Sequence, residues 1–270
     1  MKKFIVLLVC AVVLLVGYIV LDKSGTESPS FDAKKACDAG DMRGCHDLGV
    51  MYADGNGVEK DFKKAAELFK KACDGGVVFD CSTLGAMYVK GNGVEKDFKK
   101  AVELFKAACD GGEVRGCHNL GFMYAKGNGV EKDLGKAAQS LKKACDGGVV
   151  LDCSTLGAMY AKGNGVEKNE QKAVELFKKA CDGGEISGCG GLGIMYLLGD
   201  RVEKDLDKAA QLLKKACDGG ERSGCGGLGV MYEQGYGVRQ DKRLAKEYFS
   251  KACDLGEQKL GCNKYRELNR

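Results

Sequence analysis

Cysteines recur along this 270-residue chain with a fixed period of 36 residues. Seven cysteines follow one another at that interval, and each has a partner eight residues later, or nine residues later in the last pair. The fourteen residues are Cys37, Cys45, Cys73, Cys81, Cys109, Cys117, Cys145, Cys153, Cys181, Cys189, Cys217, Cys225, Cys253 and Cys262. A sequence period of about 20–50 residues indicates stacked structural repeats. Cysteines in register with it indicate one disulfide per repeat and maturation in an oxidising compartment.

The constant short separation favours pairing within each Cys-x7-Cys unit, although sequence alone does not fix connectivity in general. A row of zinc sites is the alternative. It needs clustered ligands, but no C-x-x-C occurs and the histidines are only His46 and His118. We therefore predict neither a metal nor a cofactor. The fifteenth cysteine, Cys10, lies in an apolar N-terminal segment.

The charge balance argues against nucleic acid as a partner. Lysine and arginine total 42 and aspartate and glutamate total 38, so the net charge is only +4. Nucleic-acid-binding domains carry a concentrated basic excess instead. The alternating charges between apolar positions are typical of solvated helix faces.

The N-terminus predicts export. Lys2 and Lys3 precede an almost wholly apolar run from Phe4 to Leu21, the pattern of a signal sequence. The run is long for a cleaved signal peptide and just long enough to span a bilayer. We expect residues 1–23 to form a signal anchor or a signal peptide, and residues 24–30 to form a linker. The protein would then be periplasmic and anchored in the inner membrane, or secreted if the leader is cleaved. Membrane contact would be through this segment alone.

One repeat, residues 97–132, predicts two short helices. Asp97 is a good N-cap, and Asp61, Asp133, Asn169, Asp205 and Asp241 share its register. Apolar residues then recur at helical spacing up to Cys109. Asp110-Gly111-Gly112 should end this helix through a left-handed glycine. A second helix is expected to start near Cys117 and to end at the glycine-rich turn after Lys126.

The fold class predicted from this pattern is all-α, with residues 31–270 forming a single solenoid of about six repeats between terminal caps. A glycine recurs inside the second helix of each repeat, as at Gly85 and Gly121. Since glycine destabilises a helix interior, we interpret it as a site of close packing. One turn departs from the pattern, because Arg201 stands where the other repeats have glycine.

The repeated pattern Lys-x-Ala-x-x-x-Phe/Leu-x-x-Ala-Cys, followed by Gly, Cys, Leu-Gly, Met-Tyr and Gly-x-Gly-Val, resembles the Sel-1-like repeats, a branch of the TPR-like α-solenoids. Its cysteine register is similar to that of the cysteine-rich Sel-1-like repeat proteins of Helicobacter and related bacteria. The resemblance implies a right-handed α/α superhelix, with each hairpin stapled by a disulfide, that acts as an adaptor for peptides or proteins. The cysteine-rich subfamily is also described as penicillin-binding, with slow β-lactamase activity.

The residues themselves give this enzymatic alternative little support. Serine β-lactamases combine S-x-x-K with S-D-N and K-T-G elements. Here Ser140 and Lys143 form an S-x-x-K, but neither other element occurs, and Ser140 occupies an apolar helix register. β-Lactams or cell-wall fragments thus remain alternative ligands through the resemblance only.

Two variable stripes on the second helix fit a binding face for peptide or protein on the concave side of the solenoid. Surface positions that vary without contacting any ligand are the alternative. The first stripe runs through residues 46–47, 82–83, 118–119, 154–155, 190–191 and 226–227, and the second through Asp54, Lys90, Lys126, Lys162, Leu198 and Gln234. Aromatic and arginine residues dominate binding hot spots. The predicted binding residues are His46, Ser82, Arg115, His118, Phe122, Ser154, Arg222 and Tyr236.

Overall fold

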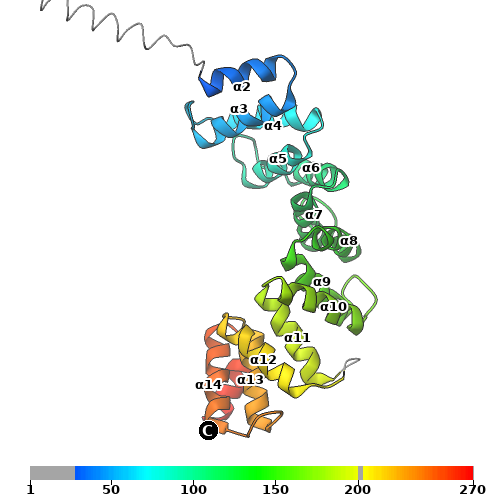
Figure 1. Cartoon of the computed structure of the whole chain (residues 1–270), viewed down its shortest axis with the longest axis vertical. Coiled ribbons are helices and arrows are strands. Elements are labelled where there is room, and N and C mark those ends of the chain that lie inside the picture. The colour runs from blue at the N-terminus through cyan, green and yellow to red at the C-terminus, as the bar shows by residue number, and fades with distance from the viewer. Residues whose placement is uncertain (1–27, 200–202, 270) are drawn as a thin grey trace, which may run out of the picture. The chain divides into compact units, whose positions relative to one another are not determined.

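The computed structural model describes residues 28–199 and 203–269, and these fall into two compact units that meet at Val77 and Val78. The first unit contains α2 (Pro29–Asp38), α3 (Met42–Asp54) and α4 (Phe62–Asp74), labelled in Figure 1. Because Ser28 caps α2 by accepting from the Phe31 N–H, the predicted linker 24–30 extends too far toward the C-terminus.

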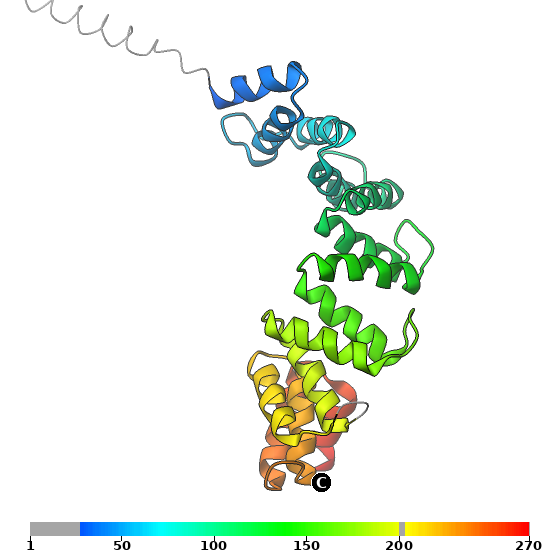
Figure 2. The same ribbon diagram turned by 45° about the vertical axis from the view of Figure 1, so that its right-hand side comes forward.

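The second unit is a run of helices in which each packs on the next (Figure 2). They are α5 (Val78–Lys90), α6 (Phe98–Asp110), α7 (Val114–Lys126), α8 (Leu134–Asp146), α9 (Val150–Lys162), α10 (Glu170–Asp182), α11 (Ile186–Leu198), α12 (Leu206–Asp218), α13 (Arg222–Gln234), α14 (Lys242–Asp254), the π-helix η1 (Gln258–Cys262) and α15 (Asn263–Glu267). No strand occurs among the described residues. The prediction of an all-α, hairpin-based solenoid is confirmed.

The even-numbered helices from α4 to α14 begin at the predicted caps. The Asp97 carboxylate accepts from the backbone N–H groups of Lys99 and Lys100 at 3.0 Å. Equivalent bonds are made by Asp61, Asp133, Asn169, Asp205 and Asp241. Each satisfies N–H groups that the first helical turn leaves without a partner.

The tight turn between α6 and α7 uses its two glycines for different reasons. Gly111 has φ −78°, and a Cβ there would lie 2.4 Å from the Val78 side chain. Gly112 has φ +87°, so it supplies the left-handed conformation. The predicted helix start near Cys117 is wrong by one turn, because Glu113 caps α7 at Val114.

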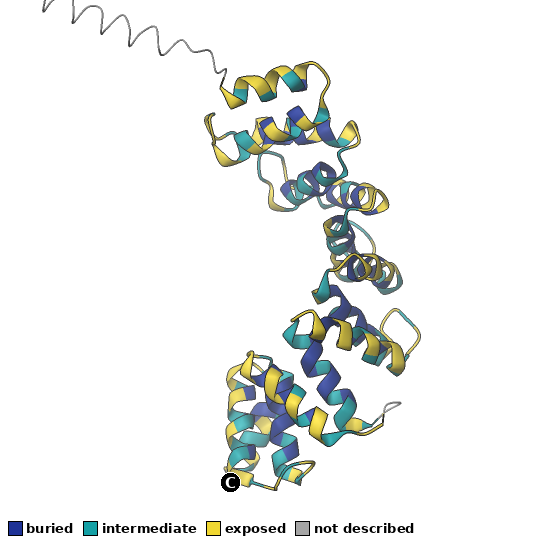
Figure 3. Ribbon diagram, viewed as in Figure 1, coloured by how far each residue is buried: buried dark blue, intermediate teal, exposed yellow. Residues whose placement is uncertain are grey.

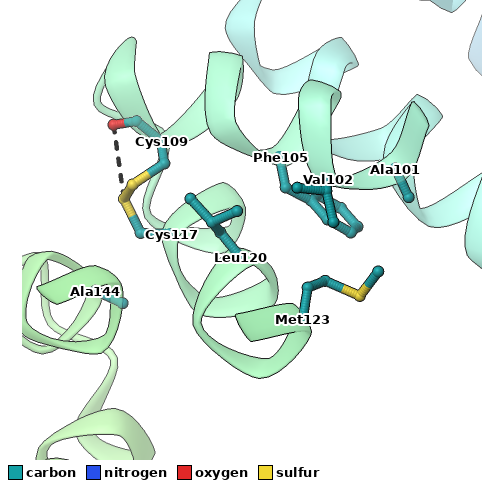
Figure 4. Close-up of a cluster of buried hydrophobic side chains, with 8 residues drawn as sticks. All are labelled: Ala101, Val102, Phe105, Cys109, Cys117, Leu120, Met123 and Ala144. Atoms are coloured by element: carbon teal, nitrogen blue, oxygen red, sulfur yellow. Dashed lines mark hydrogen bonds between the residues drawn. A yellow bond between two sulfur atoms is a disulfide. The ribbon is translucent and has the colours of Figure 1, made fainter. Parts of the chain in front are cut away.

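The disulfide pairing is confirmed. Cys109 and Cys117 staple the end of α6 to the first turn of α7, with their Cα atoms 4.5 Å apart (Figure 4). The other pairs are 37–45, 145–153, 181–189, 217–225 and 253–262, and Cys73 and Cys81 are also disulfide-bonded. So many disulfides indicate an oxidising environment.

The extra residue between the last two cysteines is absorbed by η1. There the Cys262 N–H donates to the Glu257 carbonyl oxygen five residues earlier, at 3.0 Å. A π-turn accommodates one inserted residue in an otherwise helical segment. The Cα atoms of Cys253 and Cys262 therefore still lie 4.6 Å apart.

The core is a thin layer between neighbouring helices, on the sides that face each other (Figure 3). Phe105 from α6 and Leu120 and Met123 from α7 are buried in it (Figure 4). A Cβ at Gly85 would lie 2.7 Å from the Phe105 ring, and one at Gly121 would lie 2.8 Å from Leu141. The interpretation of these glycines as close-packing sites is confirmed.

Two sequence predictions, the N-terminal segment 1–23 and the altered turn at Arg201, lie outside the described residues. Among the helices that the structure describes, none is both long and apolar enough to cross a membrane.

Candidate binding surface around Phe122

The odd-numbered helices begin in two alternative ways. The way in which α9 begins provides the partner of His118. In α7 the Glu113 carboxylate accepts from the N–H groups of Arg115 and Gly116, at 3.2 and 2.6 Å. The third residue, Gly116, has no room for a side chain, since its Cβ would lie 2.6 Å from that of Ala108. In α9 the cap is Val149, which makes no such bond. The third residue there is Asp152, whose side chain is completely buried.

The buried Asp152 carboxylate is paired with His118 from the preceding odd-numbered helix. The His118 Nδ1 lies 2.9 Å from both Asp152 carboxylate oxygens. This hydrogen bond raises the pKa of His118 above its usual value, against the opposing effect of its partial burial. The pair joins α7 to α9. His46 and Asp80 occupy the same two registers one block earlier, and Asp80 is also fully buried.

Other members of the first stripe also lie between successive repeats rather than on an open face. The Ser154 and Ser187 hydroxyl oxygens are 2.7 Å apart, and a Cβ at Gly190 would lie 3.1 Å from the Ser223 hydroxyl. Ser82 and Ser154 are each only 6% exposed. Neither side chain therefore offers much surface to a ligand, and the Ser154 hydroxyl is engaged by the next repeat.

Phe122 is the predicted residue that the surface presents most clearly. It is 36% exposed, and its ring packs 4.8 Å from that of His118. A hollow of about 250 Å³ lies on its α5 side, lined also by Ala86, Val89, Lys90, Phe105, Asn119, Met123, Lys126 and Asn128. A second hollow of about 180 Å³ lies on its α9 side, lined also by Gly121, Ala125, Leu134, Leu141, Thr155, Met159 and Asn164. We call these two hollows and Phe122 the Phe122 surface.

The structure brings members of both predicted stripes together here. Asn119 and Thr155 belong to the first stripe, and Lys90 and Lys126 to the second. Sequence reasoning missed the hollows themselves. A signal was available, however, because the register of Phe122 holds only aliphatic residues elsewhere: Val50, Ala86, Ala158, Ile194 and Val230.

The remaining predicted residues lie in separate places. Arg115 is exposed at the start of α7, where its guanidinium covers the Phe79 ring at 4.3 Å. Arg222 lies 3.9 Å from the Glu257 carboxylate. Tyr236 is 42% exposed, under the Lys204 ammonium at 5.1 Å. His46 belongs to the first unit, with its ring 6.2 Å from that of Phe69.

The S-x-x-K segment offers no exposed nucleophile. Ser140 is 6% exposed, and its hydroxyl donates to the Lys136 carbonyl oxygen at 2.9 Å. Lys143 reaches away to the Asp110 carboxylate at 3.3 Å. Within the described ranges, no group of three or more His, Cys, Asp or Glu side chains could hold a metal ion.

Stacked helical hairpins with disulfides at their turns define an α-solenoid repeat protein. The chain belongs to the Sel1 repeat family, whose model matches residues 43–77, 83–113, 114–149, 155–185, 187–221 and 223–257. In that register a repeat is an odd-numbered helix followed by an even-numbered one. The Cys109–Cys117 bridge therefore joins two successive repeats, and the expectation of a disulfide within each repeat is corrected accordingly.

Three solved structures are similar to the chain. One is c5321, a protective antigen present in uropathogenic Escherichia coli strains displaying an SLR fold, with 30% identity over 87% of this chain and a TM-score of 0.75. The chain covers 50% of c5321. A Sel1 repeat protein from Oxalobacter formigenes has 28% identity, 83% and 99% coverage of the two chains and a TM-score of 0.63. Helicobacter pylori cysteine rich protein B has 37% identity, 49% and 94% coverage and a TM-score of 0.38. No curated protein gives a significant match.

Proposed function

We propose that this protein is an exported repeat scaffold that binds a peptide or protein partner on the face formed by its odd-numbered helices, with Phe122 as an anchor. The observation that carries the proposal is an exposed aromatic ring between two hollows, which three successive odd-numbered helices help to line. Aromatic anchors beside pockets are typical of binding hot spots, and repeat stacks present such sites along extended surfaces.

The size of the hollows favours side chains of a larger partner over a free small molecule. Pockets for drug-sized ligands usually enclose about 300–1,000 Å³. The two hollows beside Phe122 enclose about 250 and 180 Å³. Each can receive one side chain of a segment that lies across α5, α7 and α9.

The proposed location is outside the cytoplasm, either anchored in the inner membrane and facing the periplasm, or secreted. The disulfides support it, as does the basic and apolar N-terminal sequence. N-terminal sequencing of the mature protein distinguishes the two cases, because an anchored protein keeps residues 1–23.

The binding proposal is tested by selecting a random 12-residue displayed peptide library on the oxidised full-length protein and measuring the affinity of enriched peptides. We expect Phe122→Ala to abolish binding of most of them. Phe62→Ala is the matched control, because Phe62 is similarly exposed, at 37%, but lies on α4 in the first unit. Enrichment of no peptide, or equal losses in the two variants, would contradict the proposal.

A further inference from the structure

We propose that the segment bound at the Phe122 surface is acidic, with carboxylates flanking one apolar side chain that enters a hollow beside Phe122. This inference rests on the proposed function and specifies its ligand. It comes from the charges of the three odd-numbered helices that carry the surface.

Every exposed charge on α5, α7 and α9 is positive. The exposed charged residues of these helices are Lys90, Arg115, Lys126 and Lys162. Their two acidic residues, Asp80 and Asp152, have no exposed surface. A partner that lies across the three helices therefore meets basic groups and no carboxylate of these helices. Electrostatic complementarity of this kind selects partners and speeds their association.

The lysines of this face differ from those of the even-numbered helices. There, four lysines are paired with the aspartate four residues later, as in Lys106–Asp110 at 2.9 Å and Lys214–Asp218 at 2.8 Å. Lys90, Lys126 and Lys162 form no ion pair among the residues that the structure describes. A lysine in the last helical turn also interacts favourably with the helix dipole. This interaction does not occupy the ammonium group, so a ligand can still bind it.

The basic row is limited to the part of the chain that carries the hollows. Its register holds lysine in α5, α7 and α9, but Leu198 in α11 and Gln234 in α13. Lys90 and Lys126 themselves line the larger hollow, together with the apolar side chains of Ala86 and Val89. The larger hollow thus combines two lysine ammonium groups with an apolar wall. This combination fits a ligand in which an apolar side chain lies between carboxylates.

The test uses fluorescence anisotropy with the oxidised full-length protein in non-ionic detergent. The probes are labelled 12-residue peptides with one central leucine or phenylalanine, flanked by glutamate, by glutamine or by lysine. We expect the glutamate peptides to bind best, and their affinity to fall as salt is raised. Phe122→Ala should abolish their binding. Removing both lysines with Lys90→Gln and Lys126→Gln should weaken it about three- to tenfold, as expected for two exposed charge contacts.

The matched control is Lys106→Gln with Lys142→Gln, which removes the same net charge from the even-numbered helices. An equal loss in both double variants would overturn the inference, because general attraction would then explain it. Equal affinity of the glutamine peptides, dependent on Phe122, would overturn acidity but leave the proposed function intact. If none of the three peptide types binds but the library selection yields peptides that bind, acidity of the ligand is likewise overturned and the proposed function stands. Binding of single-stranded dT12 as tight as that of the glutamate peptides would assign the face to polyanions in general and overturn a peptide-specific site.

Discussion

The contribution of one disulfide can be estimated from its position, and the double variant Cys109→Ala/Cys117→Ala measures it. The bridge closes a segment with a sequence separation of eight between two buried cysteines, which are 4% and 3% exposed. The chain-entropy model gives about 2.5 kcal/mol for a loop of this length. Alanine is the better replacement, because serine would also bury two hydroxyl groups at the junction. We therefore expect the free energy of unfolding to fall by about 2.5 kcal/mol.

The helices should survive this change. The turn keeps its own backbone bonds, including that from the Gly112 N–H to the Cys109 carbonyl oxygen at 3.1 Å, and Glu113 still caps α7. Urea unfolding followed by circular dichroism at 222 nm, under oxidising conditions, gives both the helical signal and the stability. A thiol assay confirms that the other cysteines remain paired.

The terminal bridge provides the control. Cys253 and Cys262 enclose a separation of nine, so the same entropy estimate applies. Their removal at the end of the stack should nevertheless lower the main transition less, since a terminal repeat can open alone. An unchanged urea midpoint for the internal variant would refute the reasoning, as would a terminal variant that is destabilised more.

Two further predictions concern a titrating group and the glycines. Because Asp152 raises the pKa of His118 above its usual 6.5, the pair stabilises the fold fully below that pH and loses this effect as pH rises through the raised value. The free energy of unfolding should therefore fall as the pH rises above about 6.5, and this slope should be smaller in His118→Gln. Gly121→Ala should destabilise by about 1–3 kcal/mol in urea unfolding, because its Cβ meets Leu141 at 2.8 Å. Gly112→Ala meets no atom within 4 Å but takes φ +87°, so it should cost only about 1 kcal/mol; a smaller loss in Gly121→Ala than in Gly112→Ala would contradict this distinction.

Sequence predicted the features that depend on local spacing. The cap at Asp97 and the bridge between Cys109 and Cys117 are set by neighbours within one turn or one hairpin, so periodicity was enough to place them. The start of α7 was misplaced because its cap is Glu113, a residue type outside the preferred N-cap set.

The features that sequence missed depend on the next repeat. Ser154 belongs to a variable stripe, and variation alone suggested a surface position. Its hydroxyl in fact contacts that of Ser187, one repeat further along. The hollows on the two sides of the Phe122 ring are likewise lined in part by side chains from α5 and α9, so one repeat alone does not reveal them. A repeat period identifies which positions are equivalent but not which of them the neighbouring repeat covers.

From α3 to α9 the two kinds of helix start alternate, so repeats two units apart share the same start. Each start places one carboxylate at the first turn of the helix. In α7 it is the cap Glu113, followed by Gly116, and in α9 it is Asp152, preceded by the cap Val149. The second way buries the carboxylate completely, so it requires His118 in the preceding odd-numbered helix. A histidine-bearing unit and an aspartate-bearing unit therefore form a matched block, and the order of repeats is constrained by the pair.

This constraint can be tested by converting one start into the other. His118→Gly leaves the Asp152 carboxylate buried without its partner and should lower the free energy of unfolding by about 3 kcal/mol or more. Adding Val149→Glu and Asp152→Gly creates the arrangement of α7, with a capping carboxylate and no side chain at the third position. We expect this triple variant to recover most of the lost stability in urea unfolding near pH 6. If the triple variant is no more stable than His118→Gly alone, a capping carboxylate at position 149 does not replace the buried carboxylate at position 152. The alternation of helix starts then has another cause.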